Sequence, residues 1–354
     1  MMKIGRSLGC GVALLLALTS VDPAQARRPR WNGLGAIAVS PDGRTIAVGG
    51  ANRTLYVVDA ESLTVTGRHW HGAQIGALAF NADGTRLVLE DETSSVLLLE
   101  TEGYTAVRTI GNTDFIAPAP QVDRMAVLLT GRQPRLALLS MTDGSTVREF
   151  ALPEGFRVLA HTLSPDGARI AVLSQEFDRP EELATEEPDG LPQGHARLLQ
   201  RNKASRFLVI DAATGELLRD HTFWYSSQGA DSTTLAFHGE DVIVFNYSGV
   251  NARIDAEGNV AVLEGLQGFA YGRGLSTDHS RIVTGGLAAG SLGRLTPDGL
   301  SVVPFNVTNR LRGWPEYFAD FAFAPGDLVY GVTSSFRIIR INEGGHVTAE
   351  APVY

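Results

Sequence analysis

The sequence repeats one pattern of short strands and tight turns along most of its length. In the clearest copies, at 35–43 and 76–84, a strand of alternating small and large apolar residues runs into a turn that ends in Asp-Gly. Two further strands follow, and after them a second turn, at 59–62 in the first copy and at 100–103 in the second. Proline presets φ and glycine permits positive φ, which suits both residues to tight turns. Each unit therefore predicts antiparallel strands with a period of about 40 residues.

Seven such units fill residues 27–354, although several of their turns are degenerate. Their first strands are expected at 36–39, 77–80, 115–119, 158–163, 233–237, 269–275 and 318–323. A repeat of this length and strand content predicts an all-β fold, a seven-bladed β-propeller of four-stranded antiparallel blades. Small residues suit the innermost strands, where seven blades converge. The last segment, 346–354, should form the outer strand of the seventh blade. The fold leaves the function open, because propellers carry unrelated activities.

The first 26 residues have the layout of a secretory signal. Lys3 and Arg6 give a positive start, 12–18 is an apolar core, and Ala24 and Ala26 form a small-x-small cleavage site. The apolar core is too short to span a bilayer. A retained anchor is the alternative. We expect a cleaved Sec-type signal, no membrane insertion, and a periplasmic or secreted protein that is a monomeric propeller.

Cysteine content and net charge exclude several kinds of site and partner. The single cysteine, Cys10, lies within the predicted signal, so the mature chain is expected to have no disulfide, thiolate metal site or covalent haem. The formal net charge is −9, and this argues against nucleic acid as a partner. No cofactor is predicted.

One unit is longer than the others. An insertion at 175–205 separates the second and third strands of the fourth blade, and its first half is acidic while its second half is basic. Long insertions in compact repeats are usually either functional or disordered. The sequence leaves both alternatives open.

The units resemble the propellers of the WD-repeat and YVTN type. The resemblance rests on the Ser-Pro-Asp-Gly turns and on the stretch 209–218, and it matches the exported bacterial branch. No unit ends in Trp-Asp, and the Gly-His pair of WD repeats is absent. Size, export, seven blades and the enlarged fourth blade also resemble the propeller β-subunit of periplasmic amine dehydrogenases. That resemblance implies a subunit of an exported assembly.

Aromatic and basic residues gather in the connections that lead from one blade to the next. Such connections share one face of a propeller, and Trp, Tyr and Arg dominate binding hot spots. The candidate binding residues are Trp70, His71, Phe156, Arg157, Trp224, Tyr225, Tyr271, Arg273, Arg312, Trp314 and Tyr317. Arginines beside aromatics favour a planar anionic partner. The alternative is that the aromatics wedge between blades.

Catalytic patterns are poorly represented. The sequence has no H-E-x-x-H and no G-x-S-x-G motif, so no catalytic residue and no metal ligand is predicted. His69 and His71 have a spacing that could place two imidazoles together, although exposed histidines more often face solvent. Glu316 and Asp320 are expected to form an ion-pair group with Arg310 and Arg312.

Two classes of function remain. The favoured one is a non-enzymatic binding or scaffold propeller that engages a protein partner or ligand in the periplasm through this aromatic and basic face. The alternative is a propeller enzyme or enzyme subunit, either a metal-assisted hydrolase of the lactonase kind or an amine dehydrogenase β-like subunit. A hydrolase needs several carboxylates converging on the axis. The starts of the first strands offer mainly Gly, Ala, Phe and Thr instead.

Overall fold

The computed structural model describes residues 33–131, 133–175, 177–178, 203–223, 233–245, 251–263, 266, 271–296, 299–308 and 316–354. The predicted signal, 1–26, lies outside these residues, as does most of the predicted insertion, 179–202. Within the described parts of the chain, no helix is long and apolar enough to cross a membrane.

The first four blades follow one another along the chain. Blade 1 consists of β1 (Leu34–Val39), β2 (Thr45–Gly50), β3 (Thr54–Asp59) and β4 (Val65–Trp70). Blade 2 consists of β5 (Ile75–Phe80), β6 (Arg86–Asp91), β7 (Ser95–Glu100) and β8 (Thr105–Gly111). Blade 3 consists of β9 (Thr113–Ala119), the short 3-10 helix η1 (Pro120–Val122), β10 (Arg124–Leu129), β11 (Arg135–Ser140) and β12 (Thr146–Ala151). Blade 4 consists of β13 (Val158–Leu163), β14 (Arg169–Ser174), β15 (Phe177–Asp178), β16 (Lys203–Asp211) and β17 (Leu217–Phe223).

The last three blades complete the ring. Blade 5 consists of β18 (Thr234–His238), β19 (Asp241–Phe245), β20 (Asn251–Ile254) and β21 (Val260–Leu263). Blade 6 consists of β22 (Gly272–Leu275), β23 (Arg281–Gly285), β24 (Ala289–Thr296) and β25 (Gly299–Asn306). Blade 7 consists of β26 (Phe318–Phe323), the 3-10 turn η3 (Pro325–Asp327), β27 (Val329–Thr333), β28 (Arg337–Ile341) and β29 (Val347–Pro352).

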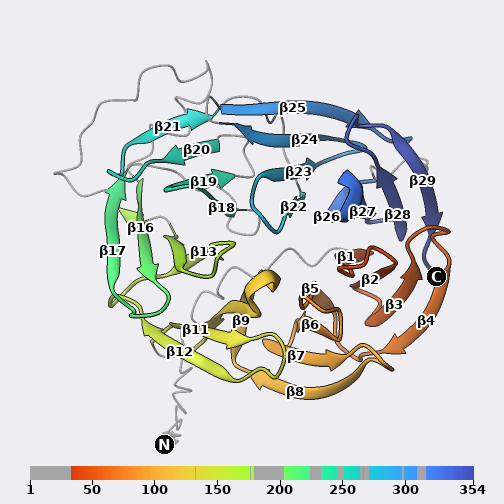
Figure 1. The fold of residues 1–354 in the computed structure, drawn as a ribbon, viewed down its shortest axis with the longest axis horizontal. Coiled ribbons are helices and arrows are strands. Elements are labelled where there is room, and N and C mark those ends of the chain that lie inside the picture. The colour runs from red at the N-terminus through yellow and green to blue at the C-terminus, as the bar shows by residue number, and fades with distance from the viewer. Residues whose placement is uncertain are drawn as a thin grey trace, which may run out of the picture.

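The sheets are arranged around a central axis as a seven-bladed propeller (Figure 1). Each blade is an antiparallel meander, with its first strand innermost and its last strand at the rim. The predicted fold class is therefore confirmed. We call the face that carries the connections between blades, and between the second and third strands of a blade, the loop face. The opposite face, which carries the hairpin turns, is the turn face.

Two predicted strand starts differ from the structure by more than two residues. The third strand of blade 4, expected from 207, begins at Lys203, because β15 pairs with its first two residues through Phe177–Ala204 and Asp178–Lys203. The two ends of the insertion thus form an antiparallel extension of the blade. The first strand of blade 6, expected from 269, begins at Gly272.

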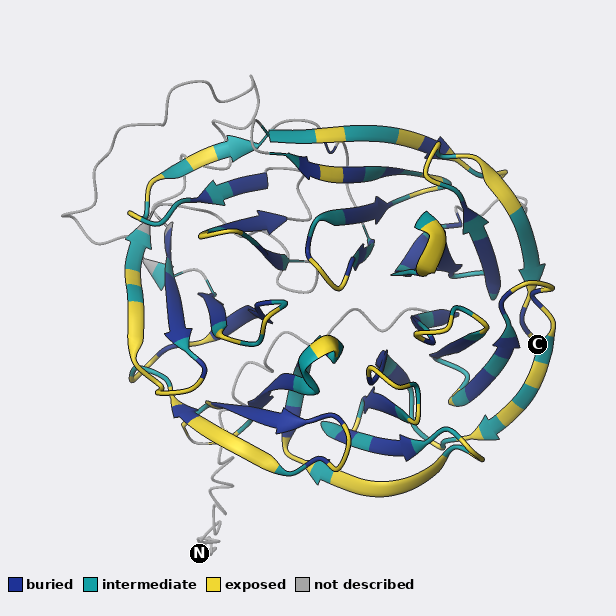
Figure 2. Ribbon diagram, viewed as in Figure 1, coloured by how far each residue is buried: buried dark blue, intermediate teal, exposed yellow. Residues whose placement is uncertain are grey.

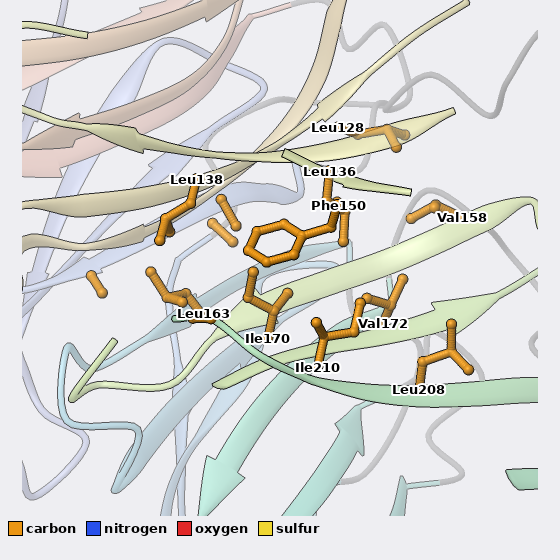
Figure 3. Packing of buried hydrophobic residues seen from close by; sticks show 14 of the residues in the cluster. Leu128, Leu136, Leu138, Phe150, Val158, Leu163, Ile170, Val172, Leu208 and Ile210 are labelled. Carbon is orange, nitrogen blue, oxygen red and sulfur yellow. The ribbon is translucent and has the colours of Figure 1, made fainter. Parts of the chain in front are cut away.

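The core lies between blades rather than within one central layer. Most residues of the middle strands are buried on both faces, as in β11, whereas the rim strands are more exposed, as in β12 (Figure 2). At the junction of blades 3 and 4, residues from seven strands meet, including Leu128, Phe150, Ile170 and Leu208 (Figure 3). Every blade therefore depends on its neighbours to bury its apolar faces.

The ring closes where blade 7 meets blade 1. The prediction that the last segment forms the outer strand of blade 7 is confirmed, since β29 pairs with β28. Val353 is fully buried in an apolar cluster that includes Ile46 and Val48 of blade 1. In addition, the Tyr330 hydroxyl donates to the Ala60 carbonyl at 3.1 Å. Closure therefore rests on packing and side-chain bonds between two blades that each come from one continuous stretch of chain.

Arginines on three rim strands reach the next blade. Each one directly follows a bulge in its strand and donates to a backbone carbonyl in a turn of the following blade. The bonds run from Arg108 Nη1 to the Asp143 carbonyl (3.3 Å), from Arg148 Nη1 to the Thr214 carbonyl (3.3 Å), and from Arg219 Nη1 to the Glu240 carbonyl (2.7 Å). We call these three residues the rim arginines.

Candidate functional site

The main cavity runs along the axis of the propeller. It has a volume of about 790 Å³, and the first strand of every blade contributes to its wall. Alanines supply much of this wall, among them Ala38, Ala77, Ala117 and Ala160. The expectation of small residues on the innermost strands is confirmed. A cavity of this size falls within the range of small-molecule sites, about 300–1,000 Å³.

The inner edges of the first strands face this cavity and have no neighbouring strand to pair with. Three of their backbone N–H groups instead donate to a side chain of an adjacent blade. The acceptors are Asp320 Oδ2 for Ile37 (3.1 Å), Glu90 Oε2 for Ile116 (3.1 Å), and His279 Nδ1 for Phe237 (3.0 Å). We call Asp320, Glu90 and His279 the channel caps. They satisfy backbone donors that would otherwise require water.

His279 occupies a position that other blades give to glycine. The turns of blades 1, 2 and 4 have Gly43, Gly84 and Gly167 at φ between 70° and 74°, and His279 has φ 58°. A non-glycine residue in this region is strained, and such strain often marks a special role. Here the role is to accept the Phe237 N–H. Burial lowers the pKa of His279 to about 4, so its imidazole is neutral and Nδ1 can accept at neutral pH.

The structure brings together three of the predicted binding residues. Tyr271 and Arg273 lie on the cavity wall in blade 6. The Tyr271 and Tyr317 rings are 5.5 Å apart between centroids and tilted by 48°. Arg273 Nη1 donates to the Phe245 carbonyl of blade 5 at 3.3 Å. Burial raises the pKa of Tyr317, a hydrogen bond with Ser334 opposes this, and the neighbouring Tyr271 adds to the rise. This group marks the loop-face mouth of the cavity.

Two other predicted binding residues are engaged inside the protein, Phe156 buried and His71 partly buried. Phe156 is only 6% exposed and packs in the cluster between blades 3 and 4, so it is a core residue and not a surface aromatic. His71 Nε2 lies 2.9 Å from Asp91 Oδ2. Burial raises the pKa of Asp91, but hydrogen bonds with His71 and Thr93 outweigh this and hold it below its usual value. His71 is therefore engaged in an internal bond.

Two more are exposed and lie apart from this group in the fold. Trp70 ends the rim strand β4 and is 73% exposed, and it is the one tryptophan among the described residues. Arg157 is exposed in the connection between blades 3 and 4, and its carbonyl accepts the Gln175 N–H at 2.7 Å. The remaining predicted binding residues, Trp224, Tyr225, Arg312 and Trp314, lie outside the described residues.

The two histidines with metal-like spacing have separate partners. The His69 ring packs 4.9 Å from that of Tyr104, whereas His71 bonds to Asp91. In the part of the chain that the structure describes, no group of three or more His, Cys, Asp or Glu side chains is placed to hold a metal ion.

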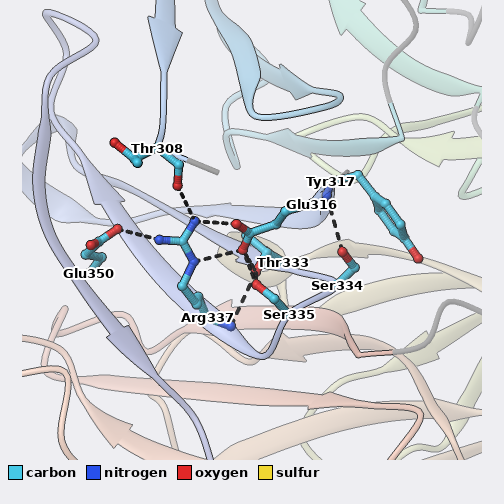
Figure 4. Close-up of polar contacts among 8 residues, drawn as sticks. All are labelled: Thr308, Glu316, Tyr317, Thr333, Ser334, Ser335, Arg337 and Glu350. Carbon is cyan, nitrogen blue, oxygen red and sulfur yellow. Dashed lines mark hydrogen bonds and ion pairs between the residues drawn. The ribbon is translucent and has the colours of Figure 1, made fainter. Parts of the chain in front are cut away.

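Glu316 lies in a buried ion-pair group with Arg337. Glu316 is 1% exposed and forms a bidentate ion pair with Arg337. Arg337 Nε donates to Glu316 Oε1 at 2.8 Å, and Nη2 donates to Oε2 at 2.5 Å (Figure 4). Arg337 also donates to Glu350 at 2.6 Å and to the Thr308 carbonyl at 3.0 Å. Asp320 lines the cavity instead. The expected group of both acids with Arg310 and Arg312 stays a prediction. Arg310 and Arg312 are outside the described residues.

The sequence reasoning missed the carboxylates of the cavity. Glu90, Asp91, Glu92, Asp114 and Asp320 line it, although the starts of the first strands were expected to offer few acids. Glu90 and Asp91 end β6, the second strand of blade 2, and Glu92 directly follows it, whereas the prediction considered only the first strands. A signal was present, because Glu90-Asp91-Glu92 directly follows the apolar run 87–89.

Comparison with known proteins adds a likeness of fold. No protein-family model matches the sequence, and no curated protein matches it. Among solved structures, hydrazine synthase of Kuenenia stuttgartiensis superposes with a TM-score of 0.58 at 15% sequence identity, over 94% of this chain and 98% of that chain. At this identity the likeness concerns the propeller alone.

Proposed function

We propose that this protein is a non-catalytic binding propeller of the periplasm that engages a partner protein with its loop face. The observation that carries the proposal is the placement of aromatic side chains on that face. Trp70 is 73% exposed at the end of β4, and the Tyr271–Tyr317 pair lies at the mouth of the axial cavity. Exposed tryptophan is unusual on a surface that binds nothing, and aromatic anchors dominate the free energy of protein interfaces.

The proposal is tested by capturing partners from periplasmic extract with the immobilised protein. Trp70→Ala should weaken capture by about 2 kcal/mol, or roughly thirtyfold in affinity, if Trp70 is an anchor. Val147→Ala is the matched control, since Val147 is an apolar rim residue that is 47% exposed. Both variants should keep the melting temperature of the parent. Equal capture by the parent and by Trp70→Ala would contradict the proposal for this residue.

A further inference from the structure

The axial cavity has an uneven distribution of charge along its length. Where the first strands begin, at the loop face, its described lining contains five carboxylates and one guanidinium: Glu90, Asp91, Glu92, Asp114, Asp320 and Arg273. Near the turn face, Asp278 is accompanied by Arg281 and His279. Arg53 lies 3.6 Å from Glu92, and His71 bonds to Asp91, yet carboxylates still outnumber cations in the loop-face half, whereas the turn-face half is close to balanced.

The fold concentrates these carboxylates on one part of the wall. Glu90 and Asp91 end β6, and Asp114 lies in the adjacent β9, so blades 2 and 3 form an acidic wall. Blade 6, which carries Tyr271 and Arg273, lies across the ring from them (Figure 1). Glu90 is 6% exposed and Asp91 is 9% exposed. Carboxylates in a narrow cavity with apolar walls focus a negative potential into it.

The aromatic pair favours the same sign of ligand. The face of a tyrosine ring attracts cations through its quadrupole, and the attraction increases when the cation is desolvated. The Tyr271–Tyr317 pair lies beside the cavity mouth, so that a group entering from the loop face passes aromatic rings before it reaches the acidic wall.

We infer that the loop-face half of the axial cavity receives a lysine or arginine side chain of the partner protein. This inference rests on the proposed function and names the chemistry of the partner. A long basic side chain can extend its methylene stem past the tyrosine rings at the mouth and place its charged head against Glu90 and Asp114. The expected partner is therefore cationic at its anchor, in contrast to the anionic partner that the sequence favoured.

The test uses the full-length protein and three labelled peptides that differ at one central residue in a Ser/Gly background. The central residue is arginine, its neutral isostere citrulline, or glutamate. Fluorescence polarisation should show saturable binding of the arginine peptide, about tenfold or more weaker binding of the citrulline peptide, and none of the glutamate peptide. Added salt should weaken binding of the arginine peptide. Equal affinities for arginine and citrulline, or no binding of either, would overturn the inference.

Three variants distinguish binding within the cavity from attraction by the overall charge of the protein. Asp114→Asn removes one carboxylate from the wall, and Glu92→Gln is a second variant in case Asp114 is needed for folding. Glu102→Gln removes one exposed carboxylate on a turn of blade 2. We expect the first two to weaken binding of the arginine peptide and the third to leave it unchanged. Equal effects of all three would show long-range attraction only. If the partner captured from extract is lost with Trp70→Ala but retained with Asp114→Asn, the proposed function stands and this inference fails.

Discussion

Polar side chains bridge neighbouring blades at two places, and the two places differ in exposure. At the rim, the rim arginines donate to carbonyls of exposed turns. Around the axis, the channel caps accept N–H groups of strand edges that face a cavity. A rim bond replaces a bond to water, so its net contribution is small. A channel cap satisfies a donor in a confined space, and its loss leaves that donor without its partner. Similar bridges are therefore expected to contribute very different free energies.

The buried pair in blade 7 should give the largest effect. Arg337→Met leaves Glu316 charged and buried, which typically costs about 3–5 kcal/mol of unfolding free energy. Urea unfolding of the purified protein measures this loss. The matched control is Arg135→Met, which breaks an ion pair with Glu149 that is about half exposed and should cost about 1 kcal/mol or less. Similar losses for both variants would show that burial does not set the difference.

The second prediction concerns the pH dependence contributed by His279. Its pKa is about 4 in the folded protein against an ordinary value of 6.5, so the unfolded chain binds a proton first as the pH falls. The stability is therefore complete above pH 6.5 and declines by about 3 kcal/mol as the pH falls towards 4. Unfolding free energies measured at several values between pH 7.5 and 5 test this decline.

A substitution isolates the histidine from other titrating groups. His279→Asn keeps an acceptor and tolerates the positive φ of this turn, so it should flatten the decline between pH 6.5 and 5. His346→Asn, at an exposed turn residue, should leave the decline unchanged. A decline that persists in His279→Asn would mean that another group is responsible.

The smallest effect is expected at the rim. Arg148→Met should lower the unfolding free energy by about 1 kcal/mol or less, because the turn carbonyl that it bonds can turn to water. Thermal and urea unfolding of the purified protein both measure this loss. A loss above about 2 kcal/mol would contradict this prediction, and the contrast between rim and axis would have to be abandoned.

The fold was predictable because its signals are local. The turn at Ser276 illustrates this, since Ser276 Oγ donates to Asp278 Oδ1 at 2.6 Å, and Ser40 bonds to Asp42 over the same distance. Ser-x-Asp therefore builds this turn with or without the following glycine. Alternation of small and large residues likewise placed the first strands, because side chains alternate between the two faces of a strand.

The candidate site was less predictable, because it depends on where each side chain ends after ring closure. Phe156 and Trp70 occupy connections of the same kind in the sequence, yet one is buried between blades and the other is exposed. Trp70 ends the rim strand β4, whose side chains alternate between half-buried and exposed, whereas Phe156 follows its rim strand and packs between blades 3 and 4. Asp114 was not predicted as a lining residue, because the apolar run placed the start of its strand at 115, whereas β9 begins at Thr113.

The sequence by itself determined the seven blades, the position of the tight turns and the enlarged fourth blade, because turn chemistry and strand periodicity act over a few residues. Only the tertiary structure decided which carboxylates meet which backbone N–H groups. Glu90 and Ile116, or Asp320 and Ile37, are distant in sequence and become neighbours when the first strands converge on the axis. Convergence also leaves the inner strand edges without partners and gathers carboxylates around one cavity. These properties belong to the closed ring and to no single repeat.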